Sequence, residues 1–173
     1  PGVDTLLGPE MRSTGEVMGI DKSFARAFLK SQIAAGIALP TSGRVFVSVK
    51  DADKKMILEA AQLLVGVGFE IVATSGTAAF LKEAGLASTL VKKVYEGRPN
   101  IVDMMKDGGI ALVFNTTDLP QSIKDSASLR ATALQMRTPY YTTAAGALAA
   151  ARAIVNRLEG EIEVETLQAY ARA

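Results

Sequence analysis

The sequence predicts an α/β fold in which a five-stranded parallel sheet lies between two layers of helices. Two observations carry this prediction. From about residue 43 onward, short apolar runs alternate with stretches whose apolar residues recur at helical spacing. The apolar runs contain few polar residues, as expected of parallel strands that are covered on both faces. This pattern is typical of a Rossmann-like three-layer sandwich.

The strands and helices follow one another in a regular order. The first strand is expected at 45–49, and the helix after it has Met56, Ala60 and Leu64 at helical spacing. Gly66 and Gly68 mark its end, as expected of glycines at a helix terminus. The remaining strands are predicted at 69–73, 89–94, 110–114 and 140–141, and the helices at 51–67, 78–85, 100–106, 120–137, 143–158 and 164–171.

The first 42 residues have a different character. Residues 1–11 show neither a strand nor a helix period, whereas 21–35 reads as one amphipathic helix with Asp21 as its cap. Its apolar face is formed by Phe24, Phe28, Leu29 and Ile33. Residues 36–43 are rich in glycine, proline and hydroxyl side chains, which predicts a linker. We therefore expect a boundary near residue 42, which divides the chain into 1–42 and 43–173.

Composition limits the classes of function. The 173 residues are 49% hydrophobic with a mean hydropathy of +0.21, enough for a sizeable core. Lys and Arg number 19 against 18 Asp and Glu, so the net charge of +1 creates no overall field for nucleic acid or a membrane surface. Cysteine and histidine are both absent, which excludes a thiol nucleophile, a Ser-His-Asp triad and the usual zinc ligands.

Location is inferred from what the sequence lacks. The longest apolar stretch, 143–155, is interrupted by Arg152 and is too short to span a bilayer, and no signal peptide opens the chain. We therefore expect a soluble, cytoplasmic protein. The chain begins at Pro1 without a methionine, which suggests a piece of a longer protein.

A turn at 74–77 resembles a phosphate cradle. It joins the second strand to a helix predicted to begin at Ala78, and it contributes the hydroxyls of Thr74, Ser75 and Thr77 around Gly76. At a helix start the first backbone N–H groups lack partners within the helix and the dipole is positive, which favours an anion. The alternative is purely local, with Thr77 as an N-cap and Gly76 as a turn residue.

Similar polar residues follow the other strands. In a parallel sheet these positions meet at one edge, where ligands bind. Lys54 lies in the first turn of a helix, against the dipole preference, and Lys93 shares a strand face with Val91. Either lysine alone is equally well explained as a surface residue. Together with the 74–77 turn they favour a phosphate and ribose site, with Ser48, Lys50, Lys92, Asn115, Thr116, Thr117, Thr142 and Thr143 at the same edge.

Four motifs, in this order along the chain, resemble one known family. They are GPEMRSTGEVMG at 8–19, ATSGTA at 73–78, VYEGRPN at 94–100 and NTT at 115–117. The sequence is similar to the carboxyl-terminal end of the large subunit of carbamoyl phosphate synthetase over nearly its whole length.

This resemblance implies a division of labour. Residues 1–42 would be the tail of the second ATP-grasp synthetase unit, and 43–173 an allosteric domain with a methylglyoxal-synthase-like fold that performs no chemistry and needs no cofactor. In the family this domain binds uridylate or, in some bacteria, inosinate, and takes part in ornithine activation and oligomer contacts. The parent enzyme is a glutamine-hydrolysing, ATP-dependent ligase of pyrimidine and arginine biosynthesis, which uses magnesium or manganese with potassium and a small glutamine amidotransferase subunit.

The resemblance also implies site residues. The nucleotide-phosphate contacts fall on Ser48, Lys54, Thr74, Thr77 and Lys93, with Ser75, Gly76, Asn115, Thr116 and Thr117 beside them. The ornithine contacts fall near Tyr140 and Thr142. Ser75 departs from the family, because some relatives have histidine there.

An enzyme remains the alternative. A stand-alone methylglyoxal synthase would act on dihydroxyacetone phosphate in the same pocket, with Asp103 or Asp118 as the base. The chain has no histidine to serve as its electrophilic partner. A purely structural domain is the third possibility.

Overall fold

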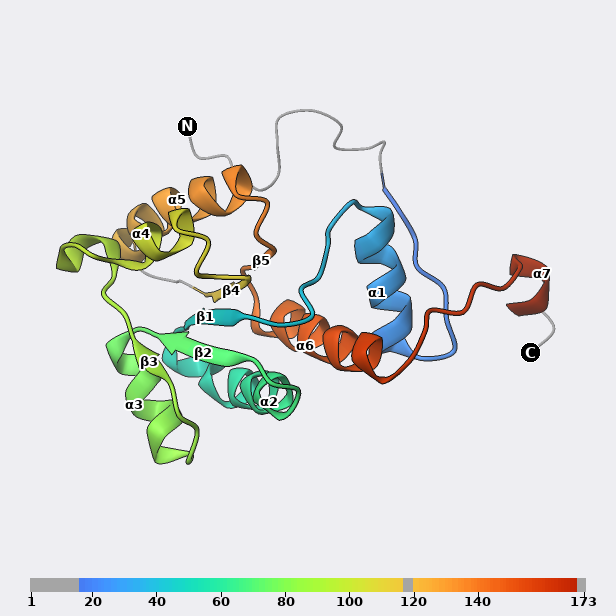
Figure 1. The fold of residues 1–173 in the computed structure, drawn as a ribbon, viewed down its shortest axis with the longest axis horizontal. Coiled ribbons are helices and arrows are strands. Elements are labelled where there is room, and N and C mark those ends of the chain that lie inside the picture. Colours follow the sequence, from blue (N-terminus) through green and yellow to red (C-terminus); the bar gives the residue numbers. More distant parts are fainter. Residues whose placement is uncertain (1–15, 117–119, 171–173) are drawn as a thin grey trace.

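The computed structural model describes residues 16–116 and 120–170, with the backbone alone for 120–125. Its centre is a five-stranded, all-parallel sheet in the order β3-β2-β1-β4-β5, which confirms the predicted fold class (Figure 1). The strands are β1 Arg44–Ser48, β2 Glu70–Ala73, β3 Thr89–Leu90, β4 Leu112–Asn115 and β5 Tyr140–Tyr141. The order of the strands reverses between β1 and β4.

Helices cover both faces of the sheet. One layer contains α2 Lys54–Gly66, α3 Ser75–Glu83 and α6 Ala144–Glu159, and the other contains α4 Ile101–Lys106 and α5 Pro120–Gln135 (Figure 1). Short 3₁₀ turns, η1 Asp51–Asp53 and η2 Val94–Glu96, precede α2 and α4. None of the helices in the described part of the chain has both the length and the hydropathy of a membrane span.

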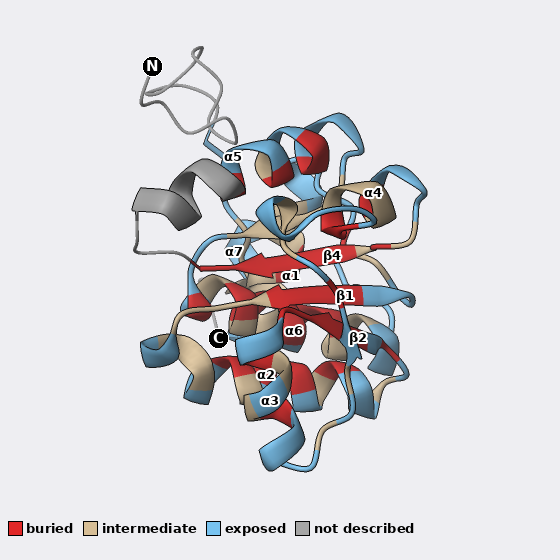
Figure 2. Ribbon diagram, turned by 90° about the vertical axis from the view of Figure 1, so that its left-hand side faces the viewer, coloured by how far each residue is buried: buried red, intermediate tan, exposed pale blue. Residues whose placement is uncertain are grey.

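The core has two parts because β1 is covered on both faces. Val45 and Val47 belong to a larger cluster, and Phe46 between them belongs to a smaller one on the other face of the sheet. The larger cluster includes Val45, Val47, Ile57, Leu64, Leu112, Phe114 and Ile154, and the smaller includes Phe46, Val72, Ile101, Met105, Val113 and Leu129. Figure 2 shows the central strands as the most continuously buried part of the fold.

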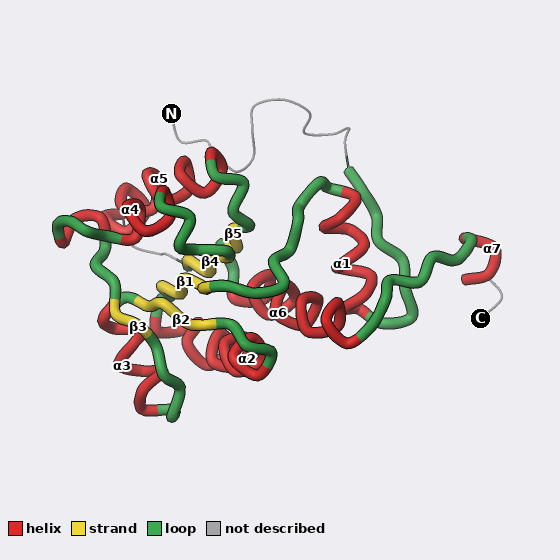
Figure 3. Tube along the Cα trace, viewed as in Figure 1, coloured by secondary structure: helices red, strands yellow, loops and turns green. Residues whose placement is uncertain are grey.

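Helix α1, Phe24–Ala34, packs on α6 outside the sheet layers. Its Leu29, together with Leu39, belongs to the larger cluster, so part of the first 42 residues shares the core of the sheet domain. Long loop segments join α1 to β1 and α6 to α7, Leu167–Tyr170 (Figure 3). The boundary near residue 42 and the assignment of 1–42 to a synthetase unit stay predictions.

Four local predictions were wrong. Ser23, not Asp21, caps α1, because its side chain accepts a hydrogen bond from Arg26 N while Asp21 pairs with Lys30. Phe24 is 67% exposed and Ile33 49%, so the buried face of α1 is narrower than its apolar stripe. In α2 the core position is Ile57, and Met56 lies at the surface. β3 ends at Leu90 rather than at residue 94, since η2 begins there.

Candidate anion-binding site

A cavity of about 490 Å³ opens at the carboxyl ends of β1, β2 and β4. This is the edge at which the strand order reverses, the usual ligand position in open parallel sheets. Eight of the predicted site residues line it: Ser48, Lys54, Thr74, Gly76, Thr77, Lys93, Asn115 and Thr116. Lys50 also lines it. Among the described residues, three lysines and one acidic residue, Asp51, therefore line the cavity. The cavity therefore favours an anion.

The turn after β2 is part of a helix. α3 begins at Ser75, three residues before the predicted start, and Thr74 is the extended residue at its N-cap position. Thr77 is therefore not the cap, and Ser75, Gly76 and Thr77 form the first helical turn. Because the N–H groups of a first turn have no partner within the helix, they are donors that an anion can accept. The side chain of Ser75 is exposed and does not line the cavity, whereas Gly76 and Thr77 do.

Three hydroxyl groups fix the loop after β1. Val49 N donates to Thr77 Oγ1 and Lys50 N donates to Thr116 Oγ1, both at 3.2 Å. The Thr74 hydroxyl donates to Ser48 Oγ at 3.1 Å. Thr74, Thr77 and Thr116 are each 5% exposed or less, so these contacts are inside the protein. The loop that leads to Lys54 is thus held from the ends of both neighbouring strands.

Lys54 enters the cavity from the first residue of α2. Its Nζ lies 2.7 Å from Asp51 Oδ1 and 5.6 Å from the centroid of the Phe80 ring. The pKa of Asp51 is lowered by this contact with Lys54. Asp51 is almost fully exposed, at 92% of its side chain, so Lys54 can exchange this partner for a ligand at little cost.

Lys93 enters from the opposite side, on the connection between β3 and α4. It is half-buried, as expected from its spacing to the buried Val91, and its Nζ lies 5.8 Å from the centroid of the Tyr95 ring. Lys92 is exposed and does not line the cavity. The structure therefore brings Lys54, Lys93 and three residues of the 74–77 turn, Thr74, Gly76 and Thr77, to one cavity, and their part in binding stays a prediction.

Asn115 is the last residue of β4 and lines the cavity. Its Nδ2 donates to Ser126 Oγ at 2.9 Å and to the hydroxyl of Tyr140, so Tyr140 lies directly behind it. Thr142 is exposed and does not line the cavity. The predicted contact of Tyr140 and Thr142 with ornithine stays a prediction. Thr117 lies outside the described residues.

Tyr141 faces the other way from Tyr140, as alternation along a strand requires. Its ring packs against Phe114 and Phe28, and its hydroxyl donates to Gln32 Oε1 at 2.9 Å. Burial raises the pKa of Tyr141 well above its usual range. β5 therefore links the cavity side of the sheet to α1.

Sequence reasoning missed one wall of the cavity. The apolar lining of the cavity includes Phe46, Val94, Ile101 and Leu129, beside the polar residues at the strand ends. A signal existed for Phe46, which lies at strand spacing from Ser48 and so shares its face. Leu129 comes from α5, and nothing in the sequence places that helix over the cavity.

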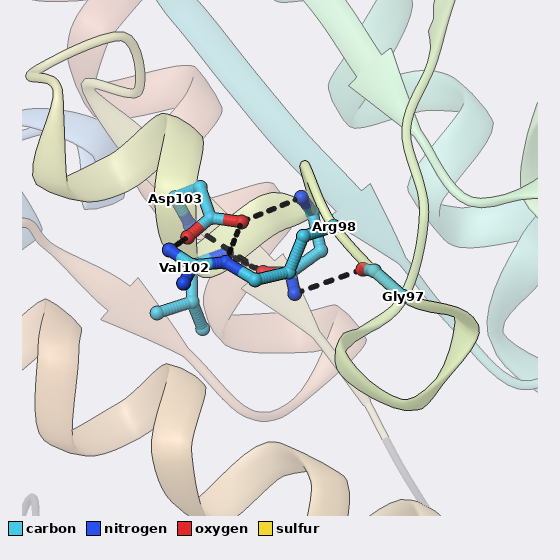
Figure 4. Close-up of polar contacts among 5 residues, drawn as sticks. Gly97, Arg98, Val102 and Asp103 are labelled. Atoms are coloured by element: carbon cyan, nitrogen blue, oxygen red, sulfur yellow. Dashed lines mark hydrogen bonds and ion pairs between the residues drawn. The ribbon is translucent and has the colours of Figure 1, made fainter.

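The two candidate bases for an enzymatic reaction fare differently. Asp103 does not line the cavity; its carboxylate accepts hydrogen bonds from Arg98 and from Asn100 N (Figure 4). These contacts, first of all the one with Arg98, lower the pKa of Asp103, which makes it a weaker base. Asp118 lies outside the described residues.

Comparisons with known proteins agree with the fold. Residues 56–142 match the MGS-like domain family. The chain is 55% identical over 170 residues to the carbamoyl phosphate synthase large chain of Mesorhizobium japonicum and 54% identical over 170 residues to that of Rhizobium meliloti; each match covers 98% of this chain and 15% of the relative. Identity to the large chain of Methanothrix thermoacetophila is 45% over 172 residues, 99% of this chain and 16% of that protein. The chain thus spans about 15% of the length of these relatives.

Proposed function

Because this chain belongs to the family of MGS-like domains, we propose that it is a regulatory domain of a carbamoyl phosphate synthase large chain, and that its cavity binds the phosphate of a nucleotide effector. The observation that carries this proposal is the meeting of Lys54, Lys93 and the first turn of α3 in one cavity. Ammonium groups and helix N-terminal amides are the donors that bind phosphate in proteins.

The volume and the lining of the cavity support a mononucleotide as its ligand. A volume of about 490 Å³ falls within the range of roughly 300–1,000 Å³ that is typical of small-molecule sites. Its polar edge suits a phosphate, while Phe46, Ile101 and Leu129 offer an apolar surface on which a flat base can lie. Uridylate and inosinate are the proposed effectors.

Regulation would operate through differential binding. An effector changes the activity of a larger protein only if its affinity differs between two conformations of that protein. We propose that the remainder of the large chain and a small glutamine amidotransferase subunit are the partners that respond, in an ATP-dependent ligase of pyrimidine and arginine biosynthesis. Ornithine activation and oligomer contacts through this domain belong to the same proposal.

Calorimetry with uridylate and inosinate tests the site. The Lys54→Ala, Lys93→Ala double variant is expected to lose about a hundredfold or more in affinity, because each hydrogen bond to a charged group contributes roughly 1.5–3 kcal/mol. The matched control is the Lys55→Ala, Lys92→Ala double variant, which removes the same charge from exposed neighbours outside the cavity. Unchanged affinity in the first double variant would remove the assignment.

The enzymatic alternative needs its own measurement. Release of methylglyoxal from dihydroxyacetone phosphate is expected to stay at the uncatalysed rate, because no histidine is present in the chain and Asp103 does not line the cavity. A rate above that background, lost in the Lys54→Ala variant, would replace regulation with catalysis.

A further inference from the structure

We propose that Asp103 is a positioning residue for Lys93, which it holds at the cavity by fixing the connection between β3 and α4. The inference rests on the proposed function of the cavity. Asp103 itself lies in the first turn of α4 and does not line the cavity, so it would act only through the backbone that carries Lys93.

The carboxylate of Asp103 ties the end of this connection to α4. It accepts hydrogen bonds from Asn100 N at 2.9 Å, from Arg98 Nε at 3.1 Å and from a second guanidinium nitrogen of Arg98 (Figure 4). The side chain of Asp103 is only 16% exposed, whereas that of Arg98 is 80% exposed. An exposed ion pair contributes little by itself, so the bond to Asn100 N is the contact that matters most.

The side chain of Asn100 forms hydrogen bonds with the backbone on both sides of it along the chain. Its Nδ2 donates to Gly97 O at 3.0 Å, and its Oδ1 accepts from Val102 N at 3.0 Å (Figure 4). Asn100 is buried, at 6% exposure, and both ends of its amide are therefore satisfied inside the protein. The segment from Gly97 to Asp103 is closed into one hydrogen-bonded unit.

Ile101, the residue after Asn100, connects this hydrogen-bonded unit to the residue before Lys93. Ile101 N donates to Lys92 O at 3.2 Å, and Lys93 N donates to Glu96 Oε2 at 2.8 Å. Lys93 and Ile101 both line the cavity. Lys92 O and Lys93 N belong to the peptide group that precedes the Lys93 side chain, so this group is held by Ile101, within the segment that Asp103 closes, and by Glu96 beside it.

The sheet cannot provide this restraint. The last pairing of β3 with β2 is Leu90 with Ala73, and one more backbone bond, from Val91 N to Ala73 O, follows it. Lys93 comes after both. Its position is therefore set by contacts to Glu96 and to the start of α4 and not by the strand ladder, and Asp103 is the side chain that holds Asn100 at the start of α4.

A double-mutant cycle separates positioning from general stability. Asp103→Ala is made in the full chain, and also in the Lys93→Ala and Lys54→Ala variants, and the affinity for uridylate is measured for each. We expect Asp103→Ala to weaken binding about tenfold in the unaltered chain and in Lys54→Ala, but less than about twofold in Lys93→Ala, since coupled residues are not additive. The same loss in both lysine backgrounds would overturn the inference.

Asp103→Asn serves as the conservative variant. It keeps an oxygen that can accept from Asn100 N but loses the charge that pairs with Arg98, so most of the affinity is expected to return. An Asn variant as weak as Asp103→Ala would show that the charge, rather than the tie to Asn100, is required, and would overturn the proposed route.

Amide hydrogen exchange distinguishes failure of the inference from failure of the proposed function. In Asp103→Ala the N–H of Ile101 is expected to exchange about a hundredfold faster, while amides of β1 and α2 keep their protection. If the unaltered chain binds no nucleotide, the proposed function fails, yet this selective change still supports the role of Asp103 in holding the connection. Unchanged exchange at Ile101 overturns the inference whatever the nucleotide result.

Discussion

Thr74 and Ser48 meet at the point where two neighbouring strands end: the Thr74 hydroxyl donates to Ser48 Oγ at 3.1 Å. In the register of β1 and β2, Val47 pairs with Ala73, so Ser48 and Thr74 are the next residues on each strand. The strand ladder therefore passes into a side-chain hydrogen bond without a break. The contact lies at the boundary between the apolar core, which contains Val47 and Ala73, and the cavity, which Ser48 and Thr74 line.

Thr77→Val tests the bracing of the loop after β1. The variant keeps the shape of the side chain but leaves Val49 N without its acceptor, so the free energy of unfolding is expected to fall by about 1 kcal/mol. Urea denaturation measures it. Thr89→Val at an exposed strand position is the control and should change stability by less than about 0.5 kcal/mol. Equal stability of the two variants would contradict the bracing role.

Gly76→Ala separates affinity from stability. A Cβ at residue 76 meets no protein atom within 4 Å, and alanine is favoured over glycine in a helix by up to about 1 kcal/mol. Thermal stability is therefore expected to hold or rise, while nucleotide affinity falls because the new methyl group occupies the cavity edge. Gly66→Ala in α2, which also meets no atom, should leave the affinity as it was. Full affinity in Gly76→Ala would exclude close approach of an anion to this turn.

Leu29→Ala tests whether α1 belongs to the core. Leu29 is 1% exposed in the larger cluster, so its truncation is expected to cost about 2–5 kcal/mol of unfolding free energy. Ile33→Ala on the same helix should cost much less, because that side chain is 49% exposed. Denaturant titration of both variants gives the comparison, and similar small costs would mean that α1 is only loosely attached.

The ion pair between Asp21 and Lys30 predicts an acid-sensitive contribution to stability. Lys30 Nζ lies 2.7 Å from Asp21 Oδ2, and this contact lowers the pKa of Asp21. The unfolded chain then takes up the proton at a higher pH than the folded one, so the stabilisation is complete above the unfolded pKa of about 3.9 and is lost as the pH falls through the folded pKa.

The Asp21→Asn variant makes this visible. Its deficit in unfolding free energy relative to the unaltered chain should be largest near neutral pH and should shrink as the pH falls below about 4. Asp107→Asn, at an exposed position, is the control and should change the unfolding free energy at neutral pH by less than about 0.5 kcal/mol. A deficit that does not depend on pH would show that the charge of Asp21 is not what stabilises.

The alternation of strands and helices was predictable because the spacing of apolar residues along the chain differs between the two. β1 and β4 were found within two residues of their bounds, since a buried parallel strand is apolar on both faces. Helix starts were harder. Thr74 and Thr77 are both good caps, and only the backbone geometry of Thr74 decides between them.

The polar half of the cavity was predictable and the apolar half was not. Ser48 and Asn115 end strands and Thr74 follows one, and parallel topology alone brings strand ends together. Ile101 and Leu129 reach the cavity from helices, whose distance from the sheet depends on packing that no local pattern encodes. The same limit explains Met56 and Ile57, which are adjacent and equally apolar, yet only Ile57 is buried.

Three residues, Phe46, Ile101 and Leu129, belong both to the smaller core cluster and to the wall of the cavity. A compound seated there would rest on the same rings and methyl groups that hold α4 and α5 against the sheet. Binding in the cavity would therefore raise the melting temperature of the domain. Melting curves recorded at increasing ligand concentration would then measure binding without a label.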